Sequence, residues 1–246
     1  MKALIVGALG IMGNHVINAV NASGNECVAF VDIKYGEDRK SNEYVKISDV
    51  KENADVIIDF SFHGLTKEIT DYAIKTGTPA VLATTGQTDE EKEVIYKASE
   101  EVAIFYTGNM SVGIATLCDV VKKVVSVFPD ADVEIIETHH NRKLDAPSGT
   151  AKMLFEAVKE ARPDAYANQG RNGLCKREKN EVGINSIRTG NIVGIHEVIV
   201  GTNTEQITLK HEAYDRALFA DGAIKAAEFM CGKKTGLYTM KELLKG

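Results

Sequence analysis

The sequence has few cysteines and prolines, four of each, and it has no apolar run of membrane-spanning length. The cysteines are widely scattered and form no Cys-x-x-Cys pair: Cys27, Cys118, Cys175 and Cys231. This spacing argues against a structural zinc site and a disulfide framework, so we expect four reduced packing residues. The first residues enter a folded pattern directly, without a signal peptide, and we therefore expect a cytoplasmic protein.

A strong basic charge is lacking as well. Lys and Arg number 29 against 35 Asp and Glu, which gives a formal net charge of −6. Without a broad positive field, neither nucleic acid nor an anionic membrane surface is expected as a partner. The composition, 44% hydrophobic and 26% charged over 246 residues, is that of a globular protein with a substantial core. We expect nearly the whole chain to fold.

Short apolar runs alternate with amphipathic stretches over the first hundred residues. The apolar runs are typical of buried strands: Ala3–Val6, Val28–Val31, Val56–Phe60, Ala80–Ala83 and Ala103–Tyr106. The stretches between them have helical periodicity at Ile11–Val20, Leu65–Lys75 and Asp89–Glu100. Strands that alternate with helices predict a parallel sheet covered on both faces. The fold class of this part is therefore α/β, a Rossmann-like doubly wound parallel sheet.

The regular alternation of short strands and helices ends after Tyr106. The next elements are expected to be a helix at Ser111–Phe128, a strand at Val133–Glu137, a helix at Thr150–Ala161 and a loop over Arg162–Gly183. Three runs joined by short turns then predict an antiparallel set of strands: Ile184–Arg188, His196–Val200 and Gln206–His211. Helical character resumes at Leu218–Cys231 and Leu237–Leu244. We expect a dinucleotide-binding domain of residues 1–108 and 214–246, with an inserted α+β substrate domain, residues 109–213, built on a mixed or antiparallel sheet.

A glycine-rich turn directly follows the first predicted strand: Gly7, Ala8, Leu9, Gly10, Ile11, Met12 and Gly13. Its glycines suit a tight turn and the close approach of backbone to a pyrophosphate, although Ala8 occupies the first glycine of the usual G-x-G-x-x-G frame. Asp32 ends the second strand, where a carboxylate can accept hydrogen bonds from the adenosine ribose and favours NAD. Lys34 and Arg39 are close enough in sequence to meet a 2′-phosphate, so both NADH and NADPH stay candidates. A glycine-rich turn in an ordinary parallel sheet is the alternative.

Two further stretches follow predicted strands, at the edge where open sheets bind ligands. One runs from Asp59 through Ser61 to His63, and the other is Thr84-Thr85-Gly86. Small side chains such as Ser61 can admit a nicotinamide ribose. An ordinary turn is the alternative at both places.

The densest polar segment of the chain runs from residue 134 to 151, after a strand and into a helix. His139 or His140 can titrate near neutral pH and donate a proton, and Lys143 offers positive charge for a carboxylate. Ser148-Gly149-Thr150 begins the helix, where free N–H groups and the helix dipole favour an anion. The alternative is a capping motif behind a solvated loop. No metal is expected, because adjacent residues of a strand point to opposite faces and the two histidines cannot readily share one ion.

At these residues the sequence resembles the dihydrodipicolinate reductases, or 4-hydroxy-tetrahydrodipicolinate reductases, of lysine and diaminopimelate biosynthesis. The resemblance is carried by Glu134, Glu137, His139, Lys143, Asp145 and the run Pro147–Ala151 at the family's spacing. It extends to Gly7–Gly13, Thr84–Gly86, Gly108–Gly113, Arg188–Gly190 with Val193, Gly194 and His196, and Gly236–Met240. The loop over residues 162–183 is poorly matched.

The resemblance implies hydride transfer from NADH or NADPH to an unsaturated cyclic imine dicarboxylate, with His139 as the general acid and Lys143 assisting. It implies that His140, Lys143, Ser148, Gly149 and Thr150 bind the substrate carboxylates. It further implies that the Gly10–Gly13 turn and Asp32 hold the adenosine end, while Thr84–Gly86 and the backbone of Gly108, Asn109 and Met110 flank the nicotinamide. The family is typically a homotetramer assembled through the sheets of its substrate domains.

Two other functions remain to be separated from this one by experiment. One is a different two-domain dehydrogenase that acts on an amino acid or semialdehyde. The other is a redox-sensing protein that binds the dinucleotide without catalysis, since a fold alone does not fix a function. The segment from His139 to Thr150 argues against the sensor, because a sensor has no need of a proton donor, a lysine and an anion cradle together.

Overall fold

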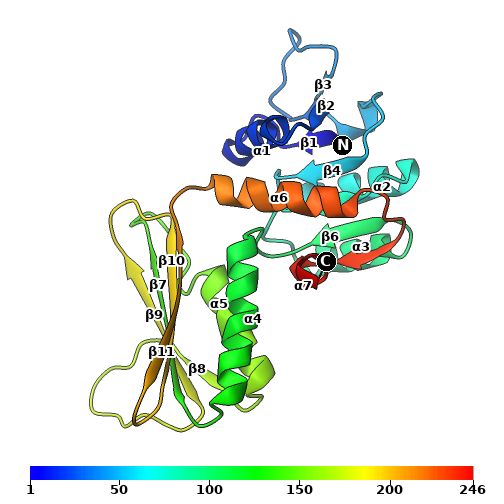
Figure 1. The fold of residues 1–246 in the computed structure, drawn as a ribbon. Helices are drawn as coiled ribbons and strands as arrows, with labels where there is room; N and C mark the ends of the chain where they lie inside the picture. Colours follow the sequence, from blue (N-terminus) through cyan, green and yellow to red (C-terminus); the bar gives the residue numbers. More distant parts are fainter. Residues whose placement is uncertain (246) are drawn as a thin grey trace. The chain divides into compact units, whose positions relative to one another are not determined.

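A computed structural model describes residues 1–245, and the chain divides into two compact units. Unit 1 consists of Met1–Ser111 together with the C-terminal segment from Arg216, and unit 2 is Val112–Asp215. Figure 1 shows the helices and strands of both units along the chain. Each unit has its own sheet and its own hydrophobic core.

Unit 1 is built on a seven-stranded sheet in the order β12-β6-β5-β4-β1-β2-β3, and every pairing in it is parallel. Its strands are β1 (Lys2–Val6), β2 (Glu26–Val31), β3 (Glu43–Tyr44), β4 (Val56–Asp59), β5 (Ala80–Leu82), β6 (Ala103–Tyr106) and β12 (Gly236–Tyr238). The central strands are almost wholly apolar and buried, as expected when helices cover both faces. The predicted doubly wound sheet is confirmed.

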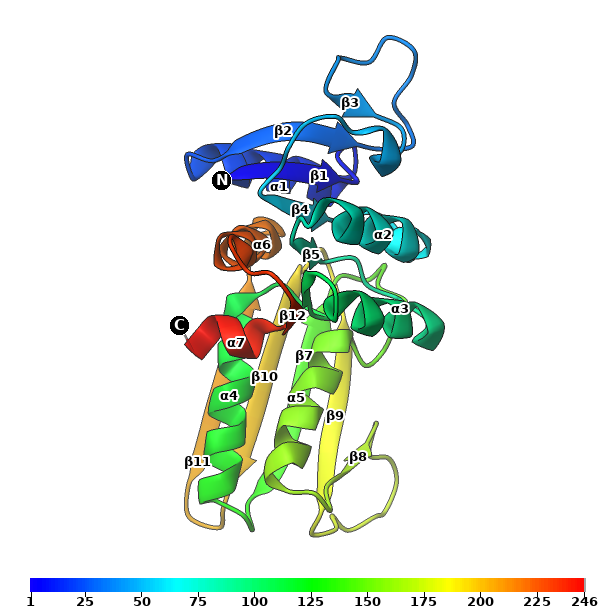
Figure 2. The ribbon, with the colours of Figure 1, turned by 90° about the vertical axis from the view of Figure 1, so that its right-hand side faces the viewer.

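Helices lie on both faces of this sheet, as Figure 2 shows. The helical elements are α1 (Ile11–Ala22), η1 (Ile47–Asp49), η2 (His63–Leu65), α2 (Thr66–Thr76), α3 (Asp89–Ser99), α6 (Ala217–Met230) and α7 (Met240–Lys245). Helix α1 packs with α6, and α2 packs with α3 on the opposite face. Thr88 and Glu91 begin α3 with a reciprocal capping box, and Gly77 ends α2 at a φ of +65°.

Unit 2 is a five-stranded mixed sheet in the order β11-β10-β7-β9-β8, with both of its helices packed on one face (Figure 1). The helices are α4 (Val112–Val127) and α5 (Gly149–Ala161). The strands are β7 (Asp132–His139), β8 (Tyr166–Asn168), β9 (Glu181–Arg188), β10 (Gly194–Gly201) and β11 (Gln206–Ala213). Alternate residues of β7, among them Val133 and Ile135, are buried against the helices.

Three local predictions were wrong. The expected loop over Arg162–Gly183 contains β8 and the start of β9, which pair in parallel. Strand β9 pairs in parallel with β7, so only β10 and β11 form the expected antiparallel neighbours among the last three strands of this unit. The expected helix at Leu237–Leu244 begins as strand β12, because residues 236–238 complete the edge of the unit 1 sheet beside β6. In each case long-range pairing outweighs local periodicity.

Candidate functional site

The glycine-rich turn of unit 1 is shaped by close backbone contacts that admit no side chain. Gly7 has a φ of +82°, and a Cβ on it would lie 2.5 Å from the carbonyl oxygen of Phe60. A Cβ on Gly13 would lie 2.1 Å from the carbonyl oxygen of Gly7. Both positions therefore require glycine, and the turn brings the free N–H groups at the start of α1 to the end of β1.

Asp32 ties this turn to the end of β2. One carboxylate oxygen of Asp32 accepts a hydrogen bond from the Leu9 backbone N–H at 3.0 Å, and the other accepts one from the Lys34 N–H at 3.0 Å. Asp32 is only half-buried, so its carboxylate can also meet a ligand. The side chain predicted to hold a ribose thus also fixes the shape of the turn beside it.

A cavity of about 500 Å³ opens beside the glycine-rich turn. Its lining includes Gly7, Gly10, Asp32, Lys34 and Ser61, all predicted from the sequence. Its lining also includes Lys46, which the sequence analysis did not select. Lys46 lies far from Asp32 in sequence and reaches this cavity because β3 pairs with β2, so spacing carries no signal for it.

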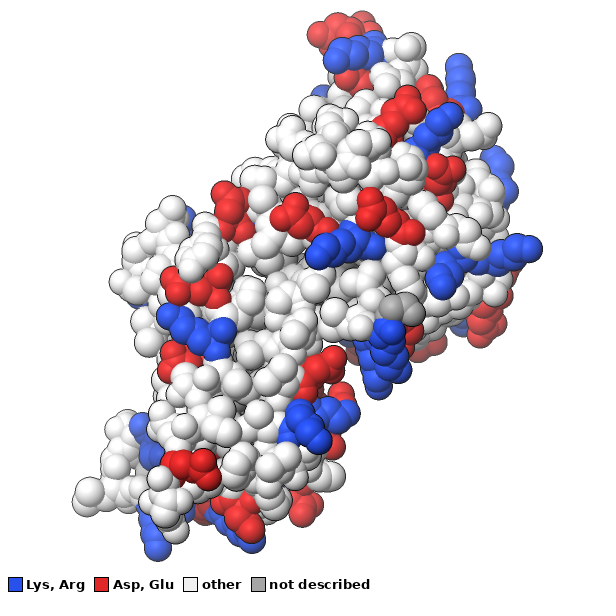
Figure 3. Space-filling model, viewed as in Figure 1, with Lys and Arg blue, Asp and Glu red and all other residues white. Residues whose placement is uncertain are grey.

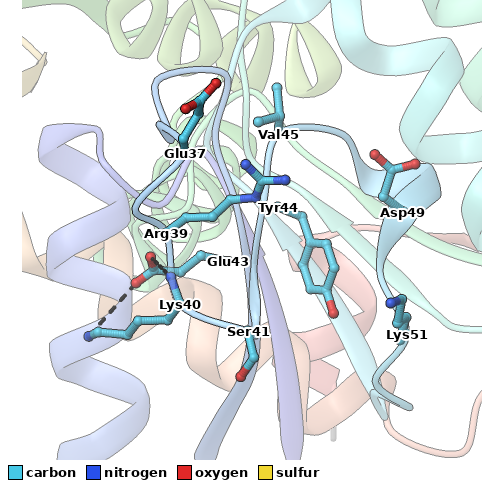
Figure 4. A pocket seen from close by; sticks show the side chains of 9 residues that line it. All are labelled: Glu37, Arg39, Lys40, Ser41, Glu43, Tyr44, Val45, Asp49 and Lys51. Atoms are coloured by element: carbon cyan, nitrogen blue, oxygen red, sulfur yellow. Dashed lines mark hydrogen bonds and ion pairs between the residues drawn. The ribbon is translucent and has the colours of Figure 1, made fainter.

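Arg39 lies elsewhere. It lines a second, shallow pocket on the segment between β2 and β4, where Figure 4 shows it with Lys40 and Glu43. Its guanidinium donates to the carbonyl oxygen of Gly36 at 3.0 Å. The structure therefore places Lys34 and Arg39, which the sequence grouped together, in the linings of different pockets.

The ends of β4 and β5 are joined by hydrogen bonds of small polar side chains. The Ser61 backbone N–H donates to Thr84 Oγ1 at 2.8 Å and to Asp59 Oδ1 at 3.0 Å. Burial raises the pKa of Asp59, although hydrogen bonds from Ser61 and Thr84 oppose the shift. Thr85 and Gly86 are exposed at the same edge, and Gly86 has a φ of +92°. The two strand-end segments predicted to receive the nicotinamide therefore form one connected surface.

The end of β6 forms a turn through Gly108, Asn109 and Met110. Asn109 Oδ1 accepts a hydrogen bond from the Ser111 N–H at 2.8 Å, and Met110 is buried. A Cβ on Gly222 of α6 would lie 1.7 Å from the Met110 carbonyl oxygen. Gly222 was not predicted; only packing between segments distant in sequence shows that α6 needs a glycine there.

In unit 2 the polar segment centres on the carboxylate of Glu137, which is fully buried. Arg188 donates to both of its oxygens, at 2.9 Å from Nη1 and 2.7 Å from Nη2. The Ser148 backbone N–H donates to it at 3.2 Å. His139 Nδ1 contacts the same carboxylate, so strands β7 and β9 and the start of α5 meet at one group.

The charges around Glu137 set its protonation. Burial raises its pKa, but hydrogen bonds from Arg188, Ser186 and His139 outweigh this and bring the pKa to about 2. The pKa of His139 is lowered, first by burial and further by the positive charges of Lys143 and Arg188, against the opposing effect of Glu137. At neutral pH Glu137 is therefore ionised, and it accepts the Nδ1 proton of a neutral His139 ring.

His196, from β10, adds a second imidazole to this cluster. Its ring lies edge-on to that of His139, with centroids 5.1 Å apart. Its Nε2 is 3.2 Å from Ser148 Oγ, which also accepts the Ala151 N–H and so begins α5. Burial, together with the charge of His139, lowers the pKa of His196 to about 3. The ring is therefore neutral and orients the capping serine.

The remaining predicted residues surround this cluster. Lys143 Nζ pairs with Asp145 at 2.8 Å, and Lys143 is half-buried. Gly149 and Thr150 form the first turn of α5, with Gly149 exposed. The His140 backbone N–H donates to the Ile192 carbonyl, while its ring Nδ1 is buried without a hydrogen bond. The structure thus brings His139, His140, Lys143 and Ser148–Thr150 to one end of the unit 2 sheet.

Within residues 1–245, no group of three His, Cys, Asp or Glu side chains is placed to hold a metal ion. Over the same residues, no helix combines the length and apolar character needed to cross a membrane. On the face drawn in Figure 3, positive and negative side chains are interspersed, without a broad patch of one sign.

Comparison with known proteins relates both units to one family. Residues 1–110 match the family model described as dihydrodipicolinate reductase, N-terminus, and residues 113–244 match the model described as its C-terminus. The chain is 42% identical over 247 residues to the 4-hydroxy-tetrahydrodipicolinate reductase of Clostridium novyi (strain NT), covering 99% of this chain and 98% of that protein. It is 41% identical over 248 residues to the enzyme of the same name from Caldanaerobacter subterraneus subsp. tengcongensis, covering 100% and 98%.

A solved structure shares the fold. The dipicolinate-bound dihydrodipicolinate reductase from Paenisporosarcina sp. TG-14 aligns with a TM-score of 0.80 at 24% identity, and the alignment covers 98% of both chains. At this identity the likeness concerns the fold alone, a seven-stranded parallel sheet and a five-stranded mixed sheet.

Proposed function

We propose that His139 and Lys143 are the catalytic residues of this chain. The chain belongs to the dihydrodipicolinate reductase family and catalyses the NAD(P)H-dependent reduction that gives tetrahydrodipicolinate. The product belongs to the diaminopimelate and lysine pathway that the resemblance implies. The observation that carries the residue assignment is the single cluster at the end of the unit 2 sheet. There Nδ1 of His139 contacts the ionised carboxylate of Glu137, which also accepts a hydrogen bond from the start of α5.

The cofactor site fits a dinucleotide on structural grounds. Gly7 and Gly13 leave the space that a Cβ would fill, and the free N–H groups at the start of α1 suit a pyrophosphate. Asp32 would hold the adenosine ribose, and Lys34 would offer a charge to a 2′-phosphate. Ser61, Thr84–Gly86 and the Gly108–Met110 backbone would flank the nicotinamide, with Ala8, Gly10, Ile11 and Met12 completing the turn. When bound, a reduced nicotinamide supplies the hydride.

Substrate binding in this proposal uses the positive end of α5. Gly149 and Thr150 lie in the first turn of α5, where the positive end of the helix dipole favours a carboxylate. Lys143 supplies a cation to the same anion, and the family resemblance assigns His140 to the same carboxylate-binding set. A cyclic imine dicarboxylate carries the two negative charges that such a site binds.

Proton transfer is assigned to His139. Glu137 holds its Nδ1, so Nε2 is the nitrogen that can exchange a proton with substrate. The acid is the imidazolium form, which the adjacent carboxylate stabilises. Burial, and then the like charge of Lys143, lower the pKa of His139 and make its proton easier to release.

We also propose a cytoplasmic homotetramer, formed through the sheet face of unit 2 that its two helices leave open. By strand alternation this face carries Ile136 of β7, Ile187 of β9, and Ile195 and Ile199 of β10, with Glu197 paired opposite Lys210. Several isoleucines on one open sheet face favour an interface between copies of the chain, and the charges among them can pair across it. The cytoplasmic location follows from the scattered spacing of the four cysteines in the sequence, which is typical of proteins of a reducing compartment.

The test is a coupled assay. The purified protein is supplied with the dihydrodipicolinate-type substrate from an active coupling enzyme, and oxidation of NADH and of NADPH is followed side by side. Substrate-dependent oxidation is expected with at least one cofactor, and the relative rates rank the two. A flat trace while the coupling enzyme turns over would contradict the proposed function.

A further inference from the structure

Glu137 contacts the His139 ring at Nδ1, and we propose that it is a positioning residue for the reaction. Its carboxylate, held by Arg188, fixes the tautomer and orientation of the His139 ring and stabilises the imidazolium that donates the proton. This inference rests on the proposed function, because it gives His139 the role of acid.

The geometry leaves the Glu137 carboxylate little freedom. The Arg188 guanidinium donates hydrogen bonds to both oxygens of Glu137, at 2.9 and 2.7 Å. It also donates one to the Asp145 carbonyl oxygen at 2.7 Å, which fixes the position of the guanidinium. The Ser148 N–H adds a third donor at 3.2 Å. A buried carboxylate with this many donors has one orientation, so its remaining contact, with His139 Nδ1, is directional.

The opposite side of the His139 ring is kept open by a glycine. A Cβ on Gly194 would lie 3.1 Å from His139 Nε2 and 3.5 Å from His196 Cε1. The ring therefore has a carboxylate on Nδ1 and a site without a side chain next to Nε2. In such a carboxylate–imidazole pair the carboxylate orients the ring through Nδ1, and Nε2 donates or accepts the proton.

Charged groups face His139 from every element around it. Glu137 lies on its own strand, Arg188 comes from β9, His196 from β10, and Lys143 from the segment after β7, paired with Asp145. Lys143 and Arg188 disfavour the imidazolium, and His196 is neutral. Glu137 is the group whose hydrogen bond and charge raise the pKa of His139.

Loss of the Glu137 charge should shift the pH dependence of turnover to lower pH. Without the charge of Glu137, the pKa of His139 falls further below its ordinary value. Turnover that needs the imidazolium is then lost at a lower pH, so the basic limb of the kcat profile moves down in pH. A role confined to packing would change stability without moving this limb.

The experiment compares Glu137→Gln with Glu156→Gln, a matched loss of charge at an exposed position of α5. Histidine ring signals are titrated by NMR in the free protein, with His139 assigned by its absence in His139→Gln. In Glu137→Gln we expect the His139 midpoint to fall by about one pH unit or more, and kcat at pH 7 to fall roughly ten- to hundredfold. Cofactor KM should stay within about twofold.

A second pair of variants covers the case in which Glu137→Gln does not fold. Arg188→Lys keeps a cation near the carboxylate and should retain most of the His139 midpoint and the turnover, whereas Arg188→Met should lose turnover. A His139 midpoint in folded Glu137→Gln that matches wild type would overturn the proposal. Wild-type turnover in His139→Gln would contradict the proposed function of His139 as the acid. The His139 midpoint in Glu137→Gln would still show, independently, whether Glu137 raises the pKa of the ring.

Discussion

Gly13 and Gly7 are packed so closely that a Cβ on Gly13 would lie 2.1 Å from the Gly7 carbonyl oxygen. Gly13→Ala must therefore push α1 away from the turn that would hold the pyrophosphate. We expect the Kd for NADH to rise by roughly tenfold or more, since about 1.4 kcal/mol of lost binding already gives tenfold. Fluorescence titration measures this Kd.

Gly201→Ala is the control, because no atom lies within 4 Å of a Cβ built there. Its NADH affinity should equal that of wild type. Equal affinities for Gly13→Ala and Gly201→Ala would show that the dinucleotide does not use this turn.

His139→Gln removes the titrating ring of the proposed acid. We expect kcat to fall roughly 10²- to 10⁴-fold, the usual contribution of a positioned general acid, with the cofactor Kd unchanged. Steady-state kinetics in the coupled assay and a binding titration separate the two effects. An unchanged kcat would remove His139 from the mechanism.

The two cationic residues selected near Asp32 should differ in function, because they line different pockets. Lys34→Ala should weaken NADPH binding by roughly tenfold and leave NADH within about twofold, since only NADPH carries the 2′-phosphate. Arg39→Ala, the matched control, should change neither Kd. Calorimetric titration with both cofactors tests this, and a loss of NADPH affinity in Arg39→Ala alone would reverse the assignment.

The ionised state of Glu137 also makes the stability of the fold depend on pH. Its pKa is about 2 in the folded protein against 4.5 in the unfolded chain, so its contribution to stability is present above pH 4.5 and is lost as the pH falls toward 2. The shift corresponds to on the order of 3 kcal/mol in the free energy of unfolding. Urea unfolding of wild type and Glu137→Gln should therefore give curves that converge between pH 4.5 and pH 3. A constant difference across that range would contradict the low pKa.

The proposed tetramer depends on the open face of the unit 2 sheet. Ile199→Lys places a charge in the middle of that face and should shift the protein toward dimers or monomers. Val120→Lys, at an exposed position of α4, makes the same change on the helical side and should leave the assembly intact. Light scattering after size-exclusion chromatography gives the mass of each variant. An assembly that survives Ile199→Lys would argue against this face.

Much of the dinucleotide unit could be predicted from the sequence because its signals are local. The strand–turn–helix around Gly7–Gly13 and the acidic end of β2 depend on near neighbours in the chain, and apolar runs of β-branched residues are typical of buried parallel strands. The polar segment from His139 to Thr150 was equally visible, since it is continuous in sequence.

The groups that complete both sites come from distant parts of the chain. Lys46 enters the dinucleotide cavity through the pairing of β3, and Gly222 admits the Met110 carbonyl through the packing of α6. Residues 236–238 form an edge strand because β6 offers unpaired backbone groups there.

The sequence by itself determined the family, the doubly wound sheet and the polar segment that carries His139, because these depend on local patterns. Only the tertiary structure decided what surrounds that ring. Arg188 from β9, Gly194 and His196 from β10, and the start of α5 reach it through strand pairing and packing. Their effect on protonation depends on burial and on distances between charges, which no spacing in a sequence specifies.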